Sequence, residues 1–459
     1  MRRVNGDRSS RSEARSELVE AVDAFGVDAV SSQALEPGLT QWRMREGVVS
    51  YAETSAAWVA VGGPLAAPSD VEGTARGFVR DARARGKRAS FFGCDHVDAF
   101  GDAFARLPLG EQPLYRPSEW ASVVAAHRGL RDQLRRARAK KVRVRRVEPA
   151  DLERGAPMRA AVDELAQTWL ASRPMEPMGF LVTLSLFEEP RRHRYWVAER
   201  EDRVVAFLSL VPIGRCGLLV EDLLRDRTTP NGTTEALFHA AMRDAAANGV
   251  EFVTWGLAPL SGPVPRSMRL LGALGRGLYD FRGLRAFKAR LHPSSWQPVY
   301  LVYPRGEPWA LHLLDSLRAF AGGSLVAFGL RTAAKRPRVL PWLLTLALIP
   351  WTVVLVVLLA LRAAEPLFGF ARAELMGWAV FDALFAALLV RAFWAPRAWK
   401  YLALALGACA DAALASIHLA HAGFGASPLS ALVRTASMLA PALAALGLAR
   451  CAIHARSGH

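Results

Sequence analysis

Residues 218–237 read LLVEDLLRDRTTPNGTTEAL and contain the sharpest change of local pattern in the chain. The apolar run at the start predicts a β-strand that ends before Asp222, and the turn-forming residues 230–232 predict a helix that begins near Thr233. Free backbone N–H groups at such a helix start attract phosphate or a developing oxyanion. On spacing alone, Asp222 and Arg225 favour a plainer interpretation, an N-capping turn with a surface ion pair.

Strands and helices alternate on both sides of this segment. Toward the N-terminus, residues 41–60 and 89–92 have strand patterns, and residues 70–86 between them have a helical pattern. Toward the middle of the chain, a β-hairpin is predicted at residues 195–211, with its turn at 201–202. The repeated rhythm predicts an α+β fold of two successive units. The predicted units are residues 21–147 and 148–310.

The segment at 128–146, RGLRDQLRRARAKKVRVRR, joins the two predicted units and has ten basic residues and one acidic residue. Leu130 and Leu134 share one helical face, so we expect a basic helix here. A solvated helix face is the simplest interpretation, but so many positive charges favour an anionic partner such as RNA phosphates or acidic lipid. Sequence-specific reading of nucleic acid is not indicated, because no zinc module or RNP motif is recognisable.

The whole chain of 459 residues has a formal net charge of +16, although only 22% of its residues are charged and 52% are hydrophobic. This composition excludes a disordered, collagen-like or disulfide-scaffold protein. The four cysteines are far apart and match no metal-ligand spacing, which favours a reducing compartment and predicts neither a metal site nor a cofactor.

The C-terminal part, residues 339–459, is strongly apolar. It begins with an uncharged run, VLPWLLTLALIPWTVVLVVLLAL at 339–361, which is longer than the roughly 20 residues that a membrane-spanning helix needs. Further apolar stretches at 375–394, 401–422 and 435–453 bring the number of predicted transmembrane helices to four. Basic residues flank one side of these helices, so the positive-inside rule predicts a multi-pass protein of a bacterial-type inner membrane with its large N-terminal part in the cytoplasm. The flanking residues are Arg331, Lys335, Arg336, Arg338, Arg391, Arg397, Lys400, Arg450 and Arg456.

Two further segments complete the predicted organisation. Residues 1–20 are polar and have no apolar core, so we expect a flexible basic arm and not a secretory signal. Residues 311–338 are expected to form a basic linker between the second unit and the first membrane helix.

Several motifs occur in an order that is typical of one family. VTWGLAPLSG at 253–262 and YDFRGLRAFKARLHPSSWQPVYLVY at 279–303 follow DLLR at 222–225 and PNGTTEAL at 230–237. LGE at 109–111 precedes all of them. Together these motifs resemble the cytoplasmic synthase domain of the aminoacyl-phosphatidylglycerol synthases, the phosphatidylglycerol lysyltransferase or multiple peptide resistance factor family.

The resemblance extends over about residues 51–303 and implies a tandem of two GNAT-like acyltransferase folds. It further implies transfer of an amino acid from aminoacyl-tRNA to the glycerol hydroxyl of phosphatidylglycerol, which changes the charge of the membrane surface. Such a reaction requires no metal and no covalent intermediate. The resemblance also suggests which basic residues face tRNA or anionic lipid. These are Arg131, Arg135, Arg138, Lys140 and Lys141.

By the same resemblance, three residues are expected to be catalytic. Asp222 is expected to orient or deprotonate the nucleophile or the amino group, Arg225 to bind a phosphate or the oxyanion, and Lys288 to neutralise a lipid or tRNA phosphate. The residues expected to bind substrate are Asn231, Gly232, Glu235, Tyr279, Arg285 and Phe287.

Two alternatives to this function stay open on the sequence. One is a related GNAT-like transferase that acts on another lipid or on a peptidoglycan precursor. The other is a catalytically idle, membrane-bound scaffold that binds RNA or lipid. A homo-oligomer is compatible with each of these functions.

Overall fold

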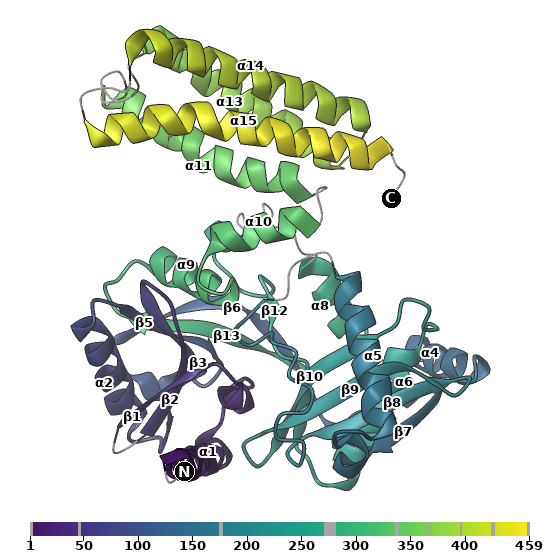
Figure 1. Cartoon of the computed structure of the whole chain (residues 1–459). Coiled ribbons are helices and arrows are strands. Elements are labelled where there is room, and N and C mark those ends of the chain that lie inside the picture. The colour runs from purple at the N-terminus through teal and green to yellow at the C-terminus, as the bar shows by residue number, and fades with distance from the viewer. Residues whose placement is uncertain are drawn as a thin grey trace. The chain divides into compact units, whose positions relative to one another are not determined.

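The computed structural model describes residues 3–44, 47–173, 178–269, 281–335, 339–362, 364, 368, 370–394, 397–423 and 427–456. The chain forms two compact units, which Figure 1 shows in ribbon form. The first unit extends to Leu325, apart from short segments at 174–176 and 274–279, and contains all the described strands. The second unit begins at Val326 and consists of helices.

Thirteen strands form one mixed sheet in the first unit. Their order is β1-β2-β3-β5-β13-β6-β11-β10-β9-β8-β7, and β4 pairs with β2 while β12 pairs with β6. The strands are β1 (Thr40–Met44), β2 (Gly47–Glu53), β3 (Ala57–Val61), β4 (Leu65–Ala66), β5 (Arg88–Cys94), β6 (Phe104–Tyr115), β7 (Arg143–Val147), β8 (Arg194–Arg200), β9 (Arg203–Ile213), β10 (Gly217–Arg225), β11 (Phe252–Thr254), β12 (Ala258–Pro259) and β13 (Ser295–Pro304).

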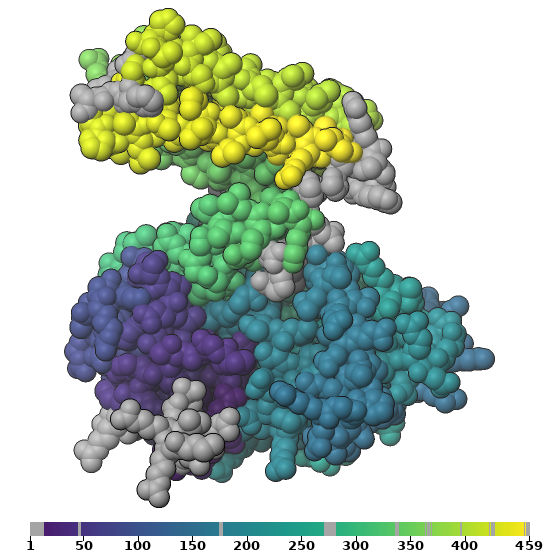
Figure 2. All heavy atoms as spheres, viewed as in Figure 1, coloured from purple at the N-terminus to yellow at the C-terminus, as the bar shows by residue number. Residues whose placement is uncertain are grey.

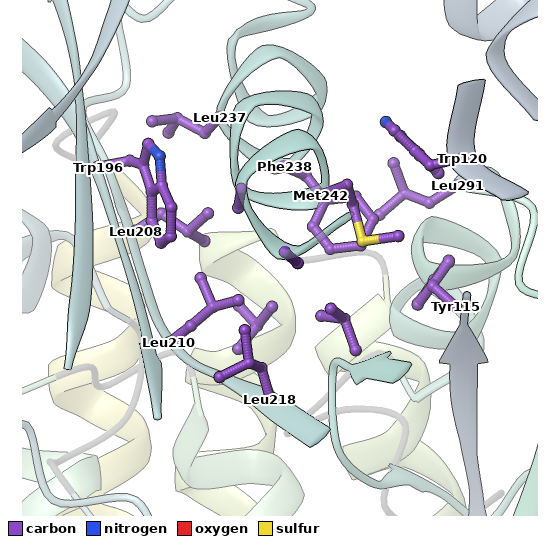
Figure 3. Packing of buried hydrophobic residues seen from close by; sticks show 14 of the residues in the cluster. Tyr115, Trp120, Trp196, Leu208, Leu210, Leu218, Leu237, Phe238, Met242 and Leu291 are labelled. Carbon is purple, nitrogen blue, oxygen red and sulfur yellow. The ribbon is translucent and has the colours of Figure 1, made fainter. Parts of the chain in front are cut away.

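Helices cover both faces of the second half of this sheet. On one face, Phe238 and Met242 of α6 pack against Trp196, Leu208 and Leu218 of the strands (Figure 3). Helix α5 packs against the alternate residues of the same strands, which face the other way. The helices of the first unit are α1 (Arg3–Phe25), the 3-10 helix η1 (Ser31–Leu35), α2 (Val71–Ala84), α3 (Trp120–Ala126), α4 (Arg128–Ala139), α5 (Pro157–Ser172), α6 (Thr233–Ala247), α8 (Phe281–Ala289) and α9 (Trp309–Phe320).

The structure confirms several predicted elements. Strands β1 to β3 occupy the predicted range 41–60, and β8 and β9 form the predicted hairpin. Its turn residues, Glu201 and Asp202, have φ angles of 52° and 57°, the left-handed conformation that a two-residue hairpin turn requires. Helix α6 begins at Thr233 as predicted, and Gly249, with φ of 67°, follows its end.

Two predictions about strands are corrected. Strand β10 does not end before Asp222 but continues to Arg225, because β9 supplies a partner along its whole length. The division into two successive units at residue 147 is also too simple. Strand β13, from the predicted second unit, lies between β5 and β6 of the predicted first unit and pairs with both. The two halves therefore share one sheet.

Three predicted segments are more regular than expected. Helix α1 replaces the flexible arm at residues 1–20, because Leu18 and Val22 are buried in the core beside Val59. The basic helix predicted over 128–146 ends at Ala139, and β7 follows. Helices α9 and α10 (Leu325–Lys335) replace the linker predicted at 311–338, and within α9 the buried Asp315 is paired with Arg88.

The second unit has four helices that are long and apolar enough to cross a membrane, as predicted. They are α11 (Leu340–Ala360), α13 (Arg372–Trp394), α14 (Ala398–Ala422) and α15 (Pro428–Arg456). Less than a third of the most apolar window of each helix is buried within the protein. The remaining apolar surface therefore faces outward, as lipid-facing surface does.

Candidate active site

A β-bulge in β10 displays two adjacent carboxylates. The pairing register of β10 with β9 shifts between Val220 and Asp222, so Glu221 is the extra residue and Asp222 lies opposite Ser209. The Ser209 hydroxyl donates a hydrogen bond to Asp222 Oδ2 at 3.0 Å and accepts one from the Asp222 N–H at 3.1 Å. This double contact holds the Asp222 carboxylate in one orientation on a rigid strand.

Glu221 and Asp222 belong to a cluster of partly buried ionisable groups. Glu221 Oε2 lies 2.8 Å from His193 Nε2, and Glu36 lies near both carboxylates. Burial, with a smaller contribution from Glu221, raises the pKa of Asp222 to about 7, although Ser209 and His193 act in the opposite direction. The pKa of Glu36 rises to about 8 by burial and by repulsion from Glu221. Asp222 and Glu36 therefore titrate near neutral pH.

The pKa of His193 moves under two opposing effects. Burial lowers it, but the hydrogen bond and the charge of Glu221 raise it overall. His193 also stacks on Tyr195, with ring centroids 5.4 Å apart. A protonated His193 therefore offsets part of the negative charge that Glu221 brings to the cluster.

A small pocket opens beside these groups, between the N-terminal segment and the second half of the sheet. Figure 2 shows the purple surface of the N-terminal residues against the blue and teal surface of later residues. Ala29 packs against Val211 and Ile213, which joins the two segments. The pocket is lined by Arg15, Ser32, Leu35, Glu36, Thr183, Ser185, Glu188, Glu189, Arg192, His193, Val211 and Glu221. The lining holds four carboxylates against two arginines and one histidine, and this acidic excess suits a positively charged ligand group.

Strands β10 and β11 separate next to this cluster. They are parallel and paired only up to Leu219 and Thr254, after which β10 stays with β9 while the chain after β11 forms β12 against β6. Asp222 therefore lies just past the paired part of β10. The segment 255–257 lies just past the paired part of β11.

The structure corrects the expectation that Lys288 neutralises a substrate phosphate. The Lys288 side chain is 3% exposed, and its ammonium donates three hydrogen bonds of 2.8 Å to the carbonyl oxygens of Trp255, Gly256 and Leu257. Burial lowers the pKa of Lys288 to about 7, while the three carbonyls favour the charged form. Since an ammonium has three donors, none remains for a substrate. Lys288 instead fixes the segment after β11.

Motifs that are far apart in the sequence meet around this lysine. Arg285 Nε donates to Glu111 Oε1 at 2.8 Å, and its guanidinium lies over the ring of Trp296. Gly110 has φ of 159°, and a Cβ there would lie 2.3 Å from the carbonyl oxygen of Ala258. The motifs at 109–111 and 253–262 and the described part of the third motif, 281–303, thus form one packed structure, and Arg285 has a structural role in it.

The other expected site residues have contacts outside the carboxylate cluster. Arg225 donates to the carbonyl of Thr229 at 2.8 Å and so stabilises the turn after β10. Asn231 is exposed, whereas Gly232, with φ of 93°, is pressed against α4, so close that a Cβ would lie 2.1 Å from the carbonyl oxygen of Gln133. The start of α6 is therefore covered by α4 and does not form the expected open pocket.

Three expected substrate-binding residues remain. Glu235 is half-buried in the first turn of α6. Phe287 packs edge-on against Trp255, with ring centroids 5.4 Å apart. Tyr279 lies outside the described residues.

The expected basic surface is exposed as predicted. Helix α4 buries Leu130, Leu134 and Ala137. Its basic side chains point away from this core. Arg131, Arg135, Arg138, Lys140 and Lys141 are all exposed.

Sequence reasoning missed four members of the cluster, Glu36, His193, Ser209 and Glu221. Their positions span more than 180 residues, and the sheet brings them together. Only Glu221 had a local signal, since it precedes Asp222 in an otherwise apolar strand. Two adjacent acidic residues in an apolar strand can indicate a β-bulge, which would direct both carboxylates to one site.

Comparison with known proteins gives a consistent result. The family described as "Phosphatidylglycerol lysyltransferase, C-terminal" matches residues 20–303. A phosphatidylglycerol lysyltransferase of Staphylococcus xylosus is 24% identical over 300 residues, which cover 60% of this chain and 33% of that protein. One from Bacillus subtilis (strain 168) is 29% identical over 151 residues, 30% of this chain and 17% of that protein. The chain spans a third or less of the length of these relatives.

Two solved structures have the same fold. The C-terminal domain (DUF2156) of a putative lysylphosphatidylglycerol synthetase from Agrobacterium fabrum has a TM-score of 0.57 at 23% identity, covering 68% of this chain and 99% of that one. L-PGS from Bacillus licheniformis has a TM-score of 0.57 at 19% identity, covering 67% of this chain and 97% of that one. These likenesses confirm the predicted α+β fold of the first unit, which four apolar helices follow.

Proposed function

Because this chain belongs to the family of phosphatidylglycerol lysyltransferase C-terminal domains, we propose that it transfers an aminoacyl group from aminoacyl-tRNA to the glycerol hydroxyl of phosphatidylglycerol. The observation that carries this proposal is the Asp222 carboxylate, which Ser209 fixes on a rigid strand and whose pKa is about 7. A group of this pKa is well suited to act as a general base at neutral pH. The transfer would change the charge of the membrane surface.

In the proposed reaction, Asp222 accepts the proton of the glycerol hydroxyl while the hydroxyl oxygen attacks the carbonyl carbon of the aminoacyl ester. A new ester bond forms to glycerol, the old bond to the ribose oxygen breaks, and the ribose oxygen takes up the proton. The ester of aminoacyl-tRNA is already activated, so alignment and proton transfer are the main tasks of the protein.

The carboxylates around Asp222 supply a place for the amino group of the donor. Glu36 and Glu221 border the pocket, and a positive ammonium would be attracted to them. Its arrival would also lower the pKa values of Asp222 and Glu36, because a positive charge favours the ionised form of a carboxyl group. The donor would thereby help to ionise the base that acts on the acceptor.

The two macromolecular partners of the proposed reaction fit two other surfaces. The exposed basic residues of α4 suit the phosphates of tRNA. The four apolar helices suit a membrane anchor close to the lipid acceptor. Because basic residues flank one side of these helices, we place the catalytic unit on the cytoplasmic side.

Lipid analysis of a bacterial host that expresses the full chain tests this function. Mass spectrometry of the lipid extract is expected to show aminoacylated phosphatidylglycerol that an empty-vector host lacks. Asp222→Asn should lower the amount of product by about 100-fold or more, because it removes the proposed base but keeps the shape of the side chain. Asp98→Asn, at a side chain that is 98% exposed, is the matched control. Absence of any new aminoacylated lipid with the unaltered chain refutes the proposal.

A further inference from the structure

A second cavity, of about 420 Å³, adjoins the pocket at the carboxylate cluster. It lies where β7 ends and β8 begins, and four arginines line it, Arg146, Arg191, Arg192 and Arg194. Glu148 is the one carboxylate among its described lining residues. The charge of the cavity is therefore opposite to that of the neighbouring pocket, and an anionic ligand suits it.

The arginines of this cavity are only partly matched by acidic partners. Arg146 and Arg194 share one carboxylate, Asp244, at 2.9 and 3.1 Å, and Arg146 also lies 3.4 Å from Glu148. Arg192 uses Nη1 to reach Asp23 at 2.7 Å, but its Nη2 is buried and has no hydrogen-bond partner. A buried guanidinium N–H without an acceptor is costly, and a phosphate oxygen is the acceptor whose geometry fits a guanidinium.

Arg191 adds a positive charge that has no ion pair or hydrogen bond among the described residues. Its side chain is exposed and lines the cavity. A ligand phosphate could therefore contact Arg191 without displacing an internal partner.

Helix α6 contacts both the basic helix α4 and two arginines of the cavity. Arg138 of α4 and Arg243 of α6 both lie near His239. Burial lowers the pKa of His239 most, and the positive charges of the two arginines lower it further. Asp244, the residue after Arg243, carries the hydrogen bonds to Arg146 and Arg194. Positive side chains thus lie on α4, on α6 and around the cavity. Positive charges spread over neighbouring elements suit a strand of successive phosphates, whereas a lipid headgroup presents a single phosphate.

The cavity is also next to the proposed reaction centre. Arg192 and His193 line both the cavity and the carboxylate pocket. His193 contacts Glu221, which precedes Asp222. In an aminoacyl-RNA the reactive ester and the nearest phosphodiester are attached to the same terminal ribose, so they must bind at adjacent sites.

From these observations we infer that the arginine-lined cavity binds a phosphodiester of the single-stranded 3′ end of the RNA donor. The identity of the RNA as the aminoacyl donor rests on the proposed function. The binding itself requires no transfer of the aminoacyl group. Arg191 and Arg192 are the residues that contact the phosphate, and Arg146 and Arg194 add to the positive potential.

Salt-dependent binding of a short single-stranded oligoribonucleotide to the full chain in detergent tests this inference. For Arg191→Gln we expect about tenfold weaker binding. We also expect the slope of log affinity against log salt concentration to be smaller in magnitude by about 0.7, because one phosphate contact on a single strand is lost. Arg80→Gln, an exposed arginine on α2, removes the same charge elsewhere and should change neither quantity. Fluorescence anisotropy of a labelled oligoribonucleotide measures both.

Two further arms decide between occupants. Equal affinity and equal slope for Arg191→Gln and the unaltered chain overturn the inference. Weaker binding of Arg191→Gln to phosphatidylglycerol vesicles, with RNA binding unchanged, overturns it in favour of a lipid phosphate. The Asp222→Asn variant should bind the oligoribonucleotide normally. If the unaltered chain makes no aminoacyl lipid but Arg191→Gln loses one phosphate contact, the proposed function is refuted and this inference stands. If the chain makes aminoacyl lipid but Arg191→Gln binds RNA as the unaltered chain does, this inference is refuted and the proposed function stands.

Discussion

Asp222 is partly buried and Lys288 is buried, and both are ionisable residues in family motifs, yet their surroundings differ. Every donor of the Lys288 ammonium is used by a backbone carbonyl of the segment 255–257. Among the described residues, Ser209 is the one side-chain hydrogen-bond donor to Asp222, and two further carboxylates, Glu221 and Glu36, lie beside it. A fully satisfied buried charge stabilises the local fold, whereas an incompletely compensated one is available for chemistry.

This difference shows how structural residues can be distinguished from catalytic residues within one set of motifs. The resemblance to a family placed both residues among the catalytic ones. Their hydrogen bonds indicate different roles. Lys288 positions the segment after β11, whereas Asp222 lies on the other side of the strand separation. Substitutions at the two positions should therefore have different consequences.

The largest expected effect on stability comes from Lys288→Met. The change leaves three buried carbonyl oxygens without donors, and we expect a loss of about 3 kcal/mol or more in the free energy of unfolding. Pulse proteolysis of the full chain in urea measures it. Lys140→Met, at an exposed lysine, is the control and should change stability by less than about 0.5 kcal/mol. Unchanged stability of Lys288→Met with lost activity would return Lys288 to the catalytic residues.

The second prediction concerns pH and follows from the raised pKa of Asp222. As a general base, Asp222 must be ionised, so kcat/KM should fall about tenfold per pH unit below about pH 7. Stability should change in the opposite direction. The folded chain binds a proton at Asp222 more tightly than the unfolded chain does, so this contribution to stability is present at low pH and is lost as pH rises from about 4 to about 7.

Asp222→Asn separates these two pH effects from the rest of the protein. The variant should be less sensitive to pH in its unfolding free energy across this window, since the side chain no longer titrates. Urea unfolding at several pH values measures this difference. An identical pH dependence in the variant and the unaltered chain would contradict the raised pKa of Asp222.

The smallest expected effect is at the ion pair next to Lys288. Glu111→Gln removes the charge that Arg285 contacts, but the Arg285 side chain is 44% exposed, so water screens the pair. We expect a loss of about 1 kcal/mol or less in the unfolding free energy and activity close to that of the unaltered chain. A large loss of activity would indicate that Arg285 contacts substrate directly.

Local pattern was sufficient for much of the fold. Alternating apolar residues predicted β8 and β9, and the strand-to-helix change at residues 230–232 predicted the start of α6. The four apolar helices also followed from the sequence, since length and hydrophobicity suffice to span a membrane. Pattern did not predict helix α1, in which Leu18 and Val22 are buried, because residues 3–17 are mostly polar.

The candidate site was less accessible to sequence reasoning. Asp222 was found, but the continuation of β10 through it was not, because a bulge depends on the partner strand. His193 and Glu36 had no local signal, since only the sheet and the packed N-terminal segment bring them to Glu221. The roles of Lys288 and Gly232 were also decided by distant neighbours, the carbonyls of 255–257 and the backbone of α4.

By itself, the sequence determined the α+β character of the first unit, the apolar helices of the second unit and the basic face of α4. These features depend on periodicity, composition and charge, which are local properties of the chain. Only the tertiary structure decided which ionisable groups remain available. The pKa of Asp222, the saturation of Lys288 and the unmatched Nη2 of Arg192 each depend on burial and on partners from elsewhere in the fold. Burial and hydrogen bonding depend on residues from elsewhere in the chain. For this reason the sequence was sufficient to identify the motifs, but the roles of their residues depend on the fold.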